Sequence, residues 1–287
     1  MTKVAIQGEA GAFSHVAAQK LLGHDVQLVP CRTFSEAFHA VSSGEADRAV
    51  IPVENALAGP VVESLDLLWS SGLKVRRETR VQIRLCVSAP PGVALEDVRS
   101  VASHPVALRQ CRNLFEQNPA MEPVVVYDTA GSVKDLMTGS VEYDAAISSR
   151  LAAELYGSHL LQTDVEDDHR NYTRFFELAG PSSVVPDPRN VCGAVAVGIP
   201  NEPGALYHLL GVFSKYAVDM NQIVARPIQG EPWKYRFYME IVAPDMEALR
   251  ECLKALDGAS DEMRIFGTYA PYEELDSDDD QDEDLKD

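Results

Sequence analysis

Through the first 180 residues, short apolar runs alternate with stretches in which apolar side chains recur at helical spacing. Residues 4–6 and 49–51 are typical of buried strands, whereas residues 14–22 have the spacing of an amphipathic helix. Further strands are predicted at residues 81–87, 100–103, 124–127 and 145–147, and a helix follows each of the last three. Strands that alternate with helices in this way predict an α/β fold in two successive portions.

The expected helix ends carry side chains that suit those positions. Thr33 and Glu36 have the spacing of a capping box, in which each side chain accepts a hydrogen bond from the backbone N–H of the other residue. Pro105 suits the first position of a helix whose apolar face includes Cys111 and Phe115. These signals predict that one helix begins directly after Thr33 and another at Pro105.

The pattern changes after residue 180. Residues 181–190 contain three prolines and predict a connector, because proline interrupts helices and central strands. The following apolar runs and helical stretches come in the order β-α-β-β-α-β, which is the split βαβ arrangement. We therefore predict four parts, at residues 1–180, 181–190, 191–270 and 271–287.

The chain is acidic, since 44 Asp and Glu against 25 Lys and Arg give a formal net charge of −19. Residues 273–287 alone contain ten carboxylates and one lysine, and we expect this tail to be disordered because its like charges repel one another. Nucleic acids and anionic membranes bind clustered Lys and Arg. Neither is therefore expected as a partner.

Other features of the sequence indicate the cellular compartment of the protein and whether it has a metal site. The longest uncharged runs, residues 190–201 and 203–214, are shorter than the roughly 20 residues that cross a bilayer, and the N-terminus lacks the apolar stretch of a secretory signal. Five cysteines without a Cys-x-x-Cys pair predict reduced thiols and a cytoplasmic protein. The seven histidines have no metal-ligand spacing, so no metal site is predicted.

Two predicted loops follow strand ends and carry candidate binding groups. Residues 8–14 contain Gly8 and Gly11 and lead into a helix, whose first N–H groups could bind an anion; the alternative is a structural turn. Glu54 and Asn55 could hold a polar substrate at the edge of a sheet, or Asn55 could cap a turn. From the residues alone, both alternatives stay open.

Two further segments combine polar groups. Ser103 is a candidate hydrogen-bond donor, Gln110 lies on the same side of the helix that follows, and His104 between them is more typical of a helix cap than of a general base. Thr173 and Arg174 place a hydroxyl directly before a guanidinium. Because a strand directs neighbouring side chains to opposite faces, both reach one ligand only where the strand is irregular; the alternative is an edge strand with a solvated Arg174.

Six segments, taken in order, resemble the prephenate dehydratase family, in which a catalytic domain precedes an ACT domain. They are residues 8–14, 52–55, 103–105 with 110–111, 128–130, 153–157, and 171 with 173–175. The resemblance covers nearly the whole chain, from residue 4 to about residue 269. It implies an α/β, two-lobed, periplasmic-binding-protein-like catalytic domain followed by a ferredoxin-like βαββαβ (ACT) domain.

The resemblance also implies a reaction without a cofactor. Prephenate loses its ring carboxylate as CO2 and its ring hydroxyl as water, which gives phenylpyruvate for phenylalanine biosynthesis. The implied catalytic residues are Thr173, as the hydrogen-bond or proton donor to the leaving oxygen, Arg174, as the partner of a substrate carboxylate, and Asn55. The implied substrate-binding residues are Ser14, Glu54, Ser103, Gln110, Thr129 and Phe175.

The last domain resembles the L-phenylalanine sensor of the same family, in which ACT domains pair across subunits. A homodimer or homotetramer is therefore implied. The implied effector-binding residues are Gly204, Ala205, Leu206, Arg226 and Pro227. The chain departs from the usual family pattern at Ala56, Val106, Val224 and Ala225. The last two replace a Glu and a Ser, which leaves open whether phenylalanine inhibits or activates.

Three alternatives remain at this point. An arogenate dehydratase acts on the amino-acid form of the same ring, and Asp128 is a candidate partner for the ammonium group of arogenate. A prephenate decarboxylase of the same fold would keep the ring hydroxyl, against which Thr173 and Arg174 argue. A non-catalytic sensor of amino acids would bind the small molecule without turnover, which an assay of product formation distinguishes.

Overall fold

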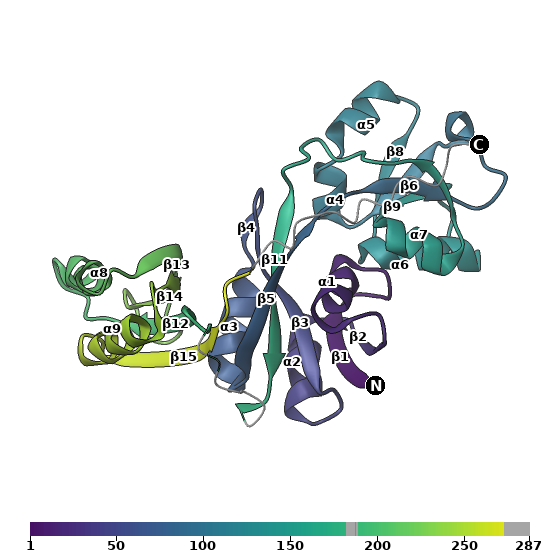
Figure 1. Ribbon diagram of the computed structural model, residues 1–287. Coiled ribbons are helices and arrows are strands. Elements are labelled where there is room, and N and C mark those ends of the chain that lie inside the picture. The colour runs from purple at the N-terminus through teal and green to yellow at the C-terminus, as the bar shows by residue number, and fades with distance from the viewer. Residues whose placement is uncertain (182–186, 188, 273–287) are drawn as a thin grey trace.

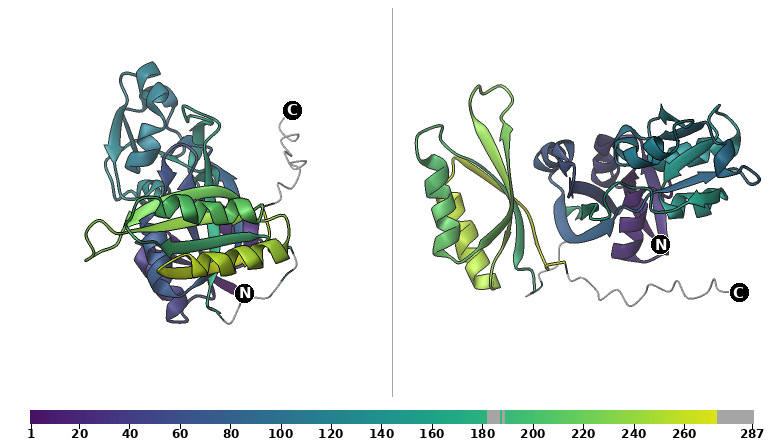
Figure 2. Two further views of the ribbon diagram at one scale, coloured as in Figure 1. Left: turned by 90° about the vertical axis from the view of Figure 1, so that its left-hand side faces the viewer. Right: turned by 90° about the horizontal axis from the view of Figure 1, so that it is seen from above.

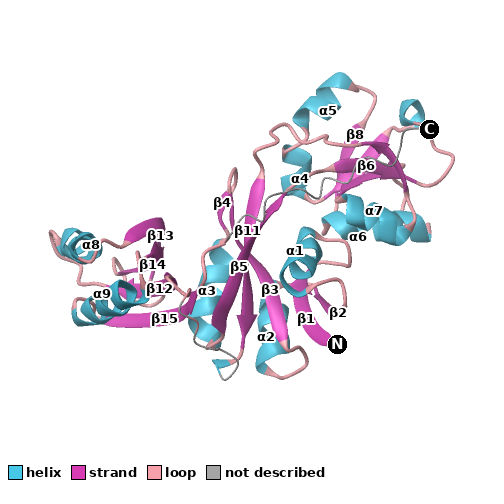
Figure 3. Cartoon of the chain, viewed as in Figure 1, coloured by secondary structure: helices cyan, strands magenta, loops and turns pink. Residues whose placement is uncertain are grey.

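The computed structural model describes residues 1–181, 187 and 189–272, which form two α/β lobes and a smaller C-terminal domain (Figure 1). Most of the predicted connector at 181–190, and nearly all of the predicted acidic tail at 271–287, lie outside the described residues. Figure 3 shows that each of the three units combines a sheet with helices. Within the described residues, no helix is both long and apolar enough to cross a membrane.

The first lobe is built on a six-stranded sheet. Its elements are β1 (Thr2–Gln7), α1 (Phe13–Leu22), β2 (Val26–Cys31), α2 (Phe34–Ser42), β3 (Arg48–Asn55), β4 (Gly59–Pro60), α3 (Val62–Ser71), β5 (Lys74–Gln82) and β11 (Tyr172–Ala179). The strand order is β2-β1-β3-β11-β5, with β4 beside β3. β11 runs antiparallel to both of its neighbours, β3 and β5, so a late segment of the chain lies in the middle of the first sheet.

The second lobe contains a five-stranded sheet in the order β10-β6-β9-β7-β8. Its elements are β6 (Cys86–Ala89), η1 (Leu95–Asp97), β7 (Ser100–Ser103), α4 (Pro105–Arg109), α5 (Arg112–Gln117), β8 (Glu122–Val125), α6 (Thr129–Thr138), β9 (Ala145–Ser148), α7 (Arg150–Tyr156) and β10 (His159–Gln162). β7 is parallel to its neighbours β8 and β9. At the opposite edge of the sheet, β10 pairs antiparallel with β6.

Three predictions about these lobes are wrong. The strand predicted at residues 81–87 is interrupted, because the chain leaves the first sheet after Gln82 and enters the second at Cys86. The helix predicted from Pro105 through Phe115 divides into α4 and α5 around Cys111. The two α/β portions are not strictly successive either, since β11 returns to the first sheet and gives the lobes a second connection.

The predicted helix signals are confirmed at the starts of α2 and α4. Thr33 Oγ1 accepts a hydrogen bond from the backbone N–H of Glu36 at 3.1 Å. The carboxylate of Glu36 accepts from the N–H of Arg32 rather than from that of Thr33, so the box is closed one residue earlier than predicted. Pro105 is the first residue of α4. Local capping chemistry therefore set these helix starts.

The C-terminal domain confirms the predicted β-α-β-β-α-β order. Its elements are β12 (Cys192–Gly198), α8 (Ala205–Lys215), β13 (Asp219–Pro227), β14 (Tyr235–Val242), α9 (Met246–Gly258) and β15 (Glu262–Tyr269), with the strand order β13-β14-β12-β15. Both helices cover one face of the sheet, and the other face is turned toward the first lobe (Figure 2).

The contact between the C-terminal domain and the first lobe is a shared apolar core. Ala194, Tyr238 and Phe266 from the C-terminal sheet pack in one buried cluster with Val75 of β5 and Phe176 of β11. The opposite face of the C-terminal sheet packs under α8 and α9 in a separate cluster. The helix-free face of the C-terminal sheet is therefore buried against the first lobe, and β11 lies directly beneath it.

Candidate active site

A cleft of about 300 Å³ lies where the two lobes meet. Its walls come from the ends of β1, β3 and β11 and the start of α1 on one side, and from the segments around α4 and the start of α6 on the other. Six of the predicted site residues line it: Ser14, Asn55, Gln110, Thr129, Thr173 and Phe175. The fold thus brings together residues that are far apart in the sequence, and their roles in the cleft stay predictions.

Three predicted site residues are not in this cleft, which corrects the expected layout. Arg174 lies on the opposite face of β11, where its guanidinium pairs with Glu54 at 2.9 Å and also with Glu240 of the C-terminal domain. The reason is the alternation of a strand, which sends Thr173 and Arg174 to opposite faces. Ser103 is fully buried and donates its hydroxyl hydrogen bond to the carbonyl of Ile147, so it stabilises the second sheet.

Asn55 and Thr173 form the polar centre of the cleft. They lie opposite each other on β3 and β11, and Asn55 Nδ2 donates a hydrogen bond to Thr173 Oγ1 at 2.9 Å. The other end of the Asn55 amide is held by the backbone N–H groups of Leu57 and Ala58, at 3.0 and 2.8 Å. Because Asn55 Oδ1 already accepts two hydrogen bonds, its NH2 group is left to donate to Thr173 Oγ1 and, at 2.7 Å, to Asn171 Oδ1. The Thr173 hydroxyl therefore keeps its own proton to donate.

The loop at residues 8–14 serves as the contact between the lobes as well as a wall of the cleft. The Gly11 carbonyl accepts a hydrogen bond from Ser149 Oγ at 2.5 Å, and Lys134 pairs with Glu9 at 2.9 Å. A Cβ atom on Gly11 would lie 2.5 Å from Cα of Ala152, and the φ of Gly11 is +90°. Glycine is therefore required here by both backbone conformation and close approach.

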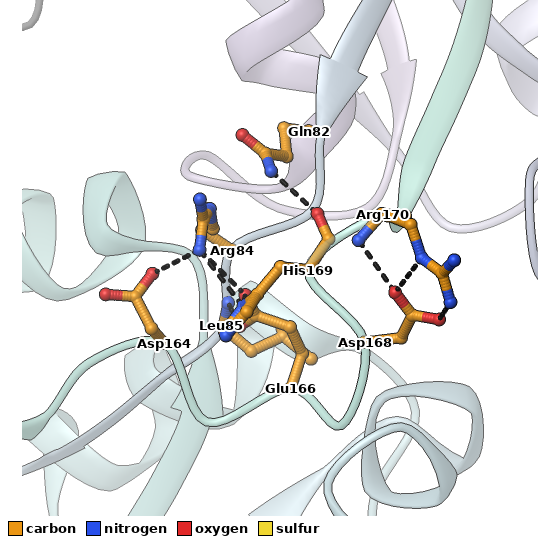
Figure 4. A network of polar contacts seen from close by, with 8 residues as sticks. All are labelled: Gln82, Arg84, Leu85, Asp164, Glu166, Asp168, His169 and Arg170. Carbon is orange, nitrogen blue, oxygen red and sulfur yellow. Dashed lines mark hydrogen bonds and ion pairs between the residues drawn. The ribbon is translucent and has the colours of Figure 1, made fainter.

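Two crossing segments, residues 83–85 and 163–171, connect the lobes and are tied together by buried charge (Figure 4). Glu166 accepts a hydrogen bond from the backbone N–H of Leu85 at 2.8 Å and pairs with Arg84 and His169. Arg84 also pairs with Asp164 at 3.0 Å. Since Leu85 itself lines the cleft, this network holds in place one of the segments that border the cleft.

Asp128 is the carboxylate of the second lobe that lines the cleft. It caps α6 by accepting a hydrogen bond from the N–H of Gly131 at 2.6 Å. Burial raises the pKa of its carboxyl group, and the hydrogen bonds from backbone N–H groups counteract that shift in part. Burial also lowers the pKa of His104, whose ring accepts from the N–H of Val106, as a helix cap does.

Among the residues that the structure describes, no Lys or Arg lines the cleft. The starts of α1 and α6 do border it, through Phe13 and Ser14 on one side and Thr129 on the other. The first N–H groups of a helix have no partner within the helix and carry partial positive charge. The start of α1 and neutral donors, in place of the expected guanidinium, are thus available to bind an anion, whereas the carboxylate of Asp128 already caps the start of α6.

Several lining residues were not predicted from the sequence. Gln7 ends β1 and Ile83 directly follows β5, and both line the cleft because these strands meet the interlobe space there. Val106, where the related family commonly has Gln, also lines it, whereas Ala56 lies outside it. The position of Gln7, as a polar residue ending an apolar strand, is the one signal that could have identified it.

The five predicted effector residues are separated within the chain. Ala205 and Leu206 line a cavity of about 140 Å³ at the start of α8, and Gly204 precedes them with a left-handed φ of +88°. Arg226, at the end of β13, instead pairs with Asp66 of α3 at 2.7 Å. Within one chain, Arg226 therefore connects the C-terminal domain to the first lobe.

Among residues 1–181, 187 and 189–272, no group of three His, Cys, Asp or Glu side chains is placed to hold a metal ion. All five cysteines are buried free thiols. Burial raises the pKa of Cys31 and Cys86 to about 11, which keeps both protonated at neutral pH.

Comparison with known proteins identifies the family. The family model described as prephenate dehydratase matches residues 4–183. Relatives include an arogenate dehydratase/prephenate dehydratase of Arabidopsis thaliana (33% identical, covering 93% of this chain and 72% of the relative) and a bifunctional chorismate mutase/prephenate dehydratase of Aquifex aeolicus (31%, 93% and 73%). A bifunctional N-acyl-homoserine lactone acylase/prephenate dehydratase of Komagataeibacter europaeus is 32% identical, covering 93% of this chain and 95% of the relative.

Solved structures agree with the sequence comparison. The prephenate dehydratase of Arthrobacter aurescens in complex with L-Phe superposes with a TM-score of 0.84 at 29% identity, covering 94% of this chain and 90% of that one. A structure described as a novel type of quorum quenching acylase gives a TM-score of 0.83 at 32% identity, covering 94% and 98%. The two-lobed cleft and the matching sequence lead to one conclusion: this chain belongs to the prephenate dehydratase family.

Proposed function

We propose that this protein converts prephenate to phenylpyruvate, CO2 and water in the interlobe cleft, with no cofactor. The bond between the ring and its carboxylate breaks, its electron pair enters the ring, and the ring hydroxyl leaves from the opposite carbon. The leaving hydroxide takes a proton and departs as water. Because the product ring is aromatic, the protein needs only to orient the substrate and to supply that proton.

The hydrogen bond between Asn55 and Thr173 carries this proposal. Thr173 Oγ1 accepts from Asn55 Nδ2, so its own O–H is free to point toward a leaving oxygen in the cleft. A threonine hydroxyl is too weak an acid to ionise at neutral pH. It therefore acts in concert with loss of the carboxylate, as a preorganised donor to charge that develops only in the transition state.

The substrate carboxylates need partners other than Arg174. Ser14, Gln110 and Thr129 line the cleft and supply neutral donors, and the start of α1 adds backbone N–H groups. Phe175, only 2% exposed, supplies an apolar surface for the ring. We propose that Glu54, Arg174 and Ser103 support the site from outside the cleft instead of touching substrate.

The test is an assay of purified protein with prephenate and with arogenate, following phenylpyruvate and phenylalanine. Thr173→Ala should lower kcat by about 100-fold or more, because it removes the donor, while Thr173→Ser, which keeps the hydroxyl, should retain most of the activity. A Thr173→Ala protein with the turnover of the wild type would overturn the mechanism. Binding of either compound without product would favour a sensor over an enzyme.

Arogenate is the second candidate substrate, and Asp128 is the observation that favours it. The side chain of arogenate ends in an ammonium group where prephenate has a ketone, and Asp128 places a carboxylate in the wall of the cleft. An ionised carboxylate attracts an ammonium group and repels a dianion. Relative rates on the two substrates decide between them.

We also propose that L-phenylalanine is an effector that binds the C-terminal domain. The cavity beside Ala205 and Leu206, and the L-Phe complex of the related Arthrobacter protein, support this assignment. A homodimer or homotetramer and a cytoplasmic location remain predictions. Activity measured with and without L-phenylalanine tests the effector proposal. The molar mass in solution tests the oligomeric state.

A further inference from the structure

Arg174 lies at a buried junction between the catalytic lobe and the C-terminal domain. Its guanidinium contacts three carboxylates: Glu240, Glu54 at 2.9 Å and Glu78 at 3.6 Å. Arg174 and Glu240 are only 7% and 5% exposed. The position of a guanidinium this deeply buried depends on its carboxylate partners, because an unpaired buried charge is strongly unfavourable.

Glu240 is the partner that comes from the C-terminal domain. It lies in the middle of β14, opposite Ala194 of β12 and Gln222 of β13. Its neighbours Met239 and Ile241 pack under α8 and α9, so alternation along the strand directs Glu240 to the helix-free face that covers β11. Its Oε1 atom has no hydrogen-bond partner among the described residues. Arg174 is thus its principal contact.

β3 and β11, the strands of Glu54 and Arg174, carry the proposed catalytic pair, Asn55 and Thr173, on their other face. Thr173 is opposite Asn55, and Arg174 is opposite Glu54, in the register of β11 on β3. The hydrogen bond of Asn55 to Thr173 and the ion pair of Arg174 with Glu54 therefore bridge β3 and β11 on opposite faces at adjacent positions.

The pairing of β11 with β3 is irregular at this point. The register of β11 on β3 shifts between Arg174 and Phe175. A register shift leaves part of the ladder unpaired and re-aims nearby side chains. Side-chain contacts thus contribute more to the orientation of Thr173 here than in a regular ladder.

From these contacts, and on the basis of the proposed function, we propose that Glu240 is a positioning residue for the dehydratase reaction. By holding Arg174 on the outer face of β11, it fixes the Thr173 hydroxyl toward the cleft on the inner face. The C-terminal domain thereby completes the catalytic site of its own chain, although none of its described residues lines the cleft.

The test compares Glu240→Gln, Glu240→Ala, Arg174→Ala and the double variant Glu240→Ala/Arg174→Ala in the full chain. The assays are run at pH 8, where Glu240 of the folded protein is ionised. At this pH, Glu240→Gln keeps the shape of the side chain and removes its charge, so it serves if Glu240→Ala does not fold. Asp66→Asn is the matched control, because it breaks the other ion pair between the domains, with Arg226, without touching β11. Thermal unfolding and circular dichroism verify that each variant is folded.

We expect each Glu240 variant to lower kcat by ~10- to 100-fold, with KM for the substrate changed by no more than about twofold, since a misdirected donor affects the transition state. Asp66→Asn should keep the kcat of the wild type. If Glu240 acts through Arg174, the double variant is no slower than Arg174→Ala.

Two results overturn the inference while leaving the proposed function intact: folded Glu240 variants with the kcat of the wild type, or effects that multiply in the double variant. A change only in the thermal midpoint is the result of a structural role and also overturns it. A wild-type protein that turns over neither prephenate nor arogenate overturns the proposed function, and this inference fails with it.

Discussion

At the scale of a single residue, Asp128 combines a structural and a chemical position. Its carboxylate caps α6 through Gly131 and at the same time lines the cleft. Gly8 accommodates this carboxylate, because a Cβ atom on Gly8 would lie 2.7 Å from Asp128 Oδ2. The cap fixes where the carboxylate lies, and burial raises its pKa. One side chain thus sets both the start of a helix and the charge of the cleft.

Asp128→Asn tests whether that charge selects the substrate. Asn caps a helix about as well as Asp, so the fold is retained while the negative charge is lost. We expect the ratio of kcat/KM for arogenate to that for prephenate to fall by about tenfold, which corresponds to ~1.4 kcal/mol. Asp135→Asn, on the same helix, is the control and should leave the ratio unchanged. An unaltered ratio in Asp128→Asn contradicts the assignment.

At the scale of elements, the cleft depends on the two crossings between the lobes. Glu166 ties the segment after β10 to the segment after β5 by accepting the N–H of Leu85 and pairing with Arg84. Its side chain is fully buried, whereas that of Asp168 two residues later is 29% exposed and pairs with the exposed Arg170. Glu166 therefore stabilises the connection between the lobes, whereas Asp168 pairs within its own exposed loop (Figure 4).

Glu166→Gln and Asp168→Asn form a matched pair for measuring this difference. We expect Glu166→Gln to lower the free energy of unfolding by about 1–3 kcal/mol, because the N–H of Leu85 and the guanidinium of Arg84 lose a charged partner. Asp168→Asn should leave it nearly unchanged, as is usual for exposed ion pairs. Chemical denaturation measures both values. Equal effects of the two substitutions would show that the crossing does not depend on Glu166.

At the scale of the whole molecule, buried charge joins the C-terminal domain to the first lobe. Burial raises the pKa of Glu240 to about 7, against an ordinary value of 4.5. Arg174 lowers this pKa, whereas the neighbouring carboxylates Glu78 and Glu54 raise it. Tyr269, also buried at this junction, has its own pKa raised by burial and by Glu240. We therefore expect the stability of this interface to depend on pH.

The sign of that sensitivity follows from proton binding. Unfolded Glu240 loses its proton near pH 4.5, while the folded protein keeps it until about pH 7. Between these values the native state binds more protons, so this group makes the free energy of unfolding fall as the pH rises, and its effect levels off above about pH 7. Relative to Glu240→Gln, the wild type should thus lose stability between pH 5 and pH 8. Parallel curves for the two proteins would contradict this.

Much of the local structure follows from the sequence. The apolar run at residues 4–6 is fully buried in β1, Thr33 caps α2, and the β-α-β-β-α-β order of the C-terminal domain is as predicted. Each depends on contacts within one element or between close neighbours, and the hydrophobic pattern encodes such contacts directly. The strand predicted at residues 81–87 failed because its apolar pattern continues through a crossing between two sheets, which periodicity does not reveal.

What only the tertiary structure decided is which face each functional side chain takes. The sequence determined that Thr173 and Arg174 are adjacent, that a strand must separate them, and that Asn55 ends another strand. It did not determine that β11 lies between β3 and β5, nor that the C-terminal domain covers its outer face. Those long-range pairings place Thr173 in the cleft and Arg174 against Glu240, because a strand buried on both faces presents its alternate side chains to two different neighbours.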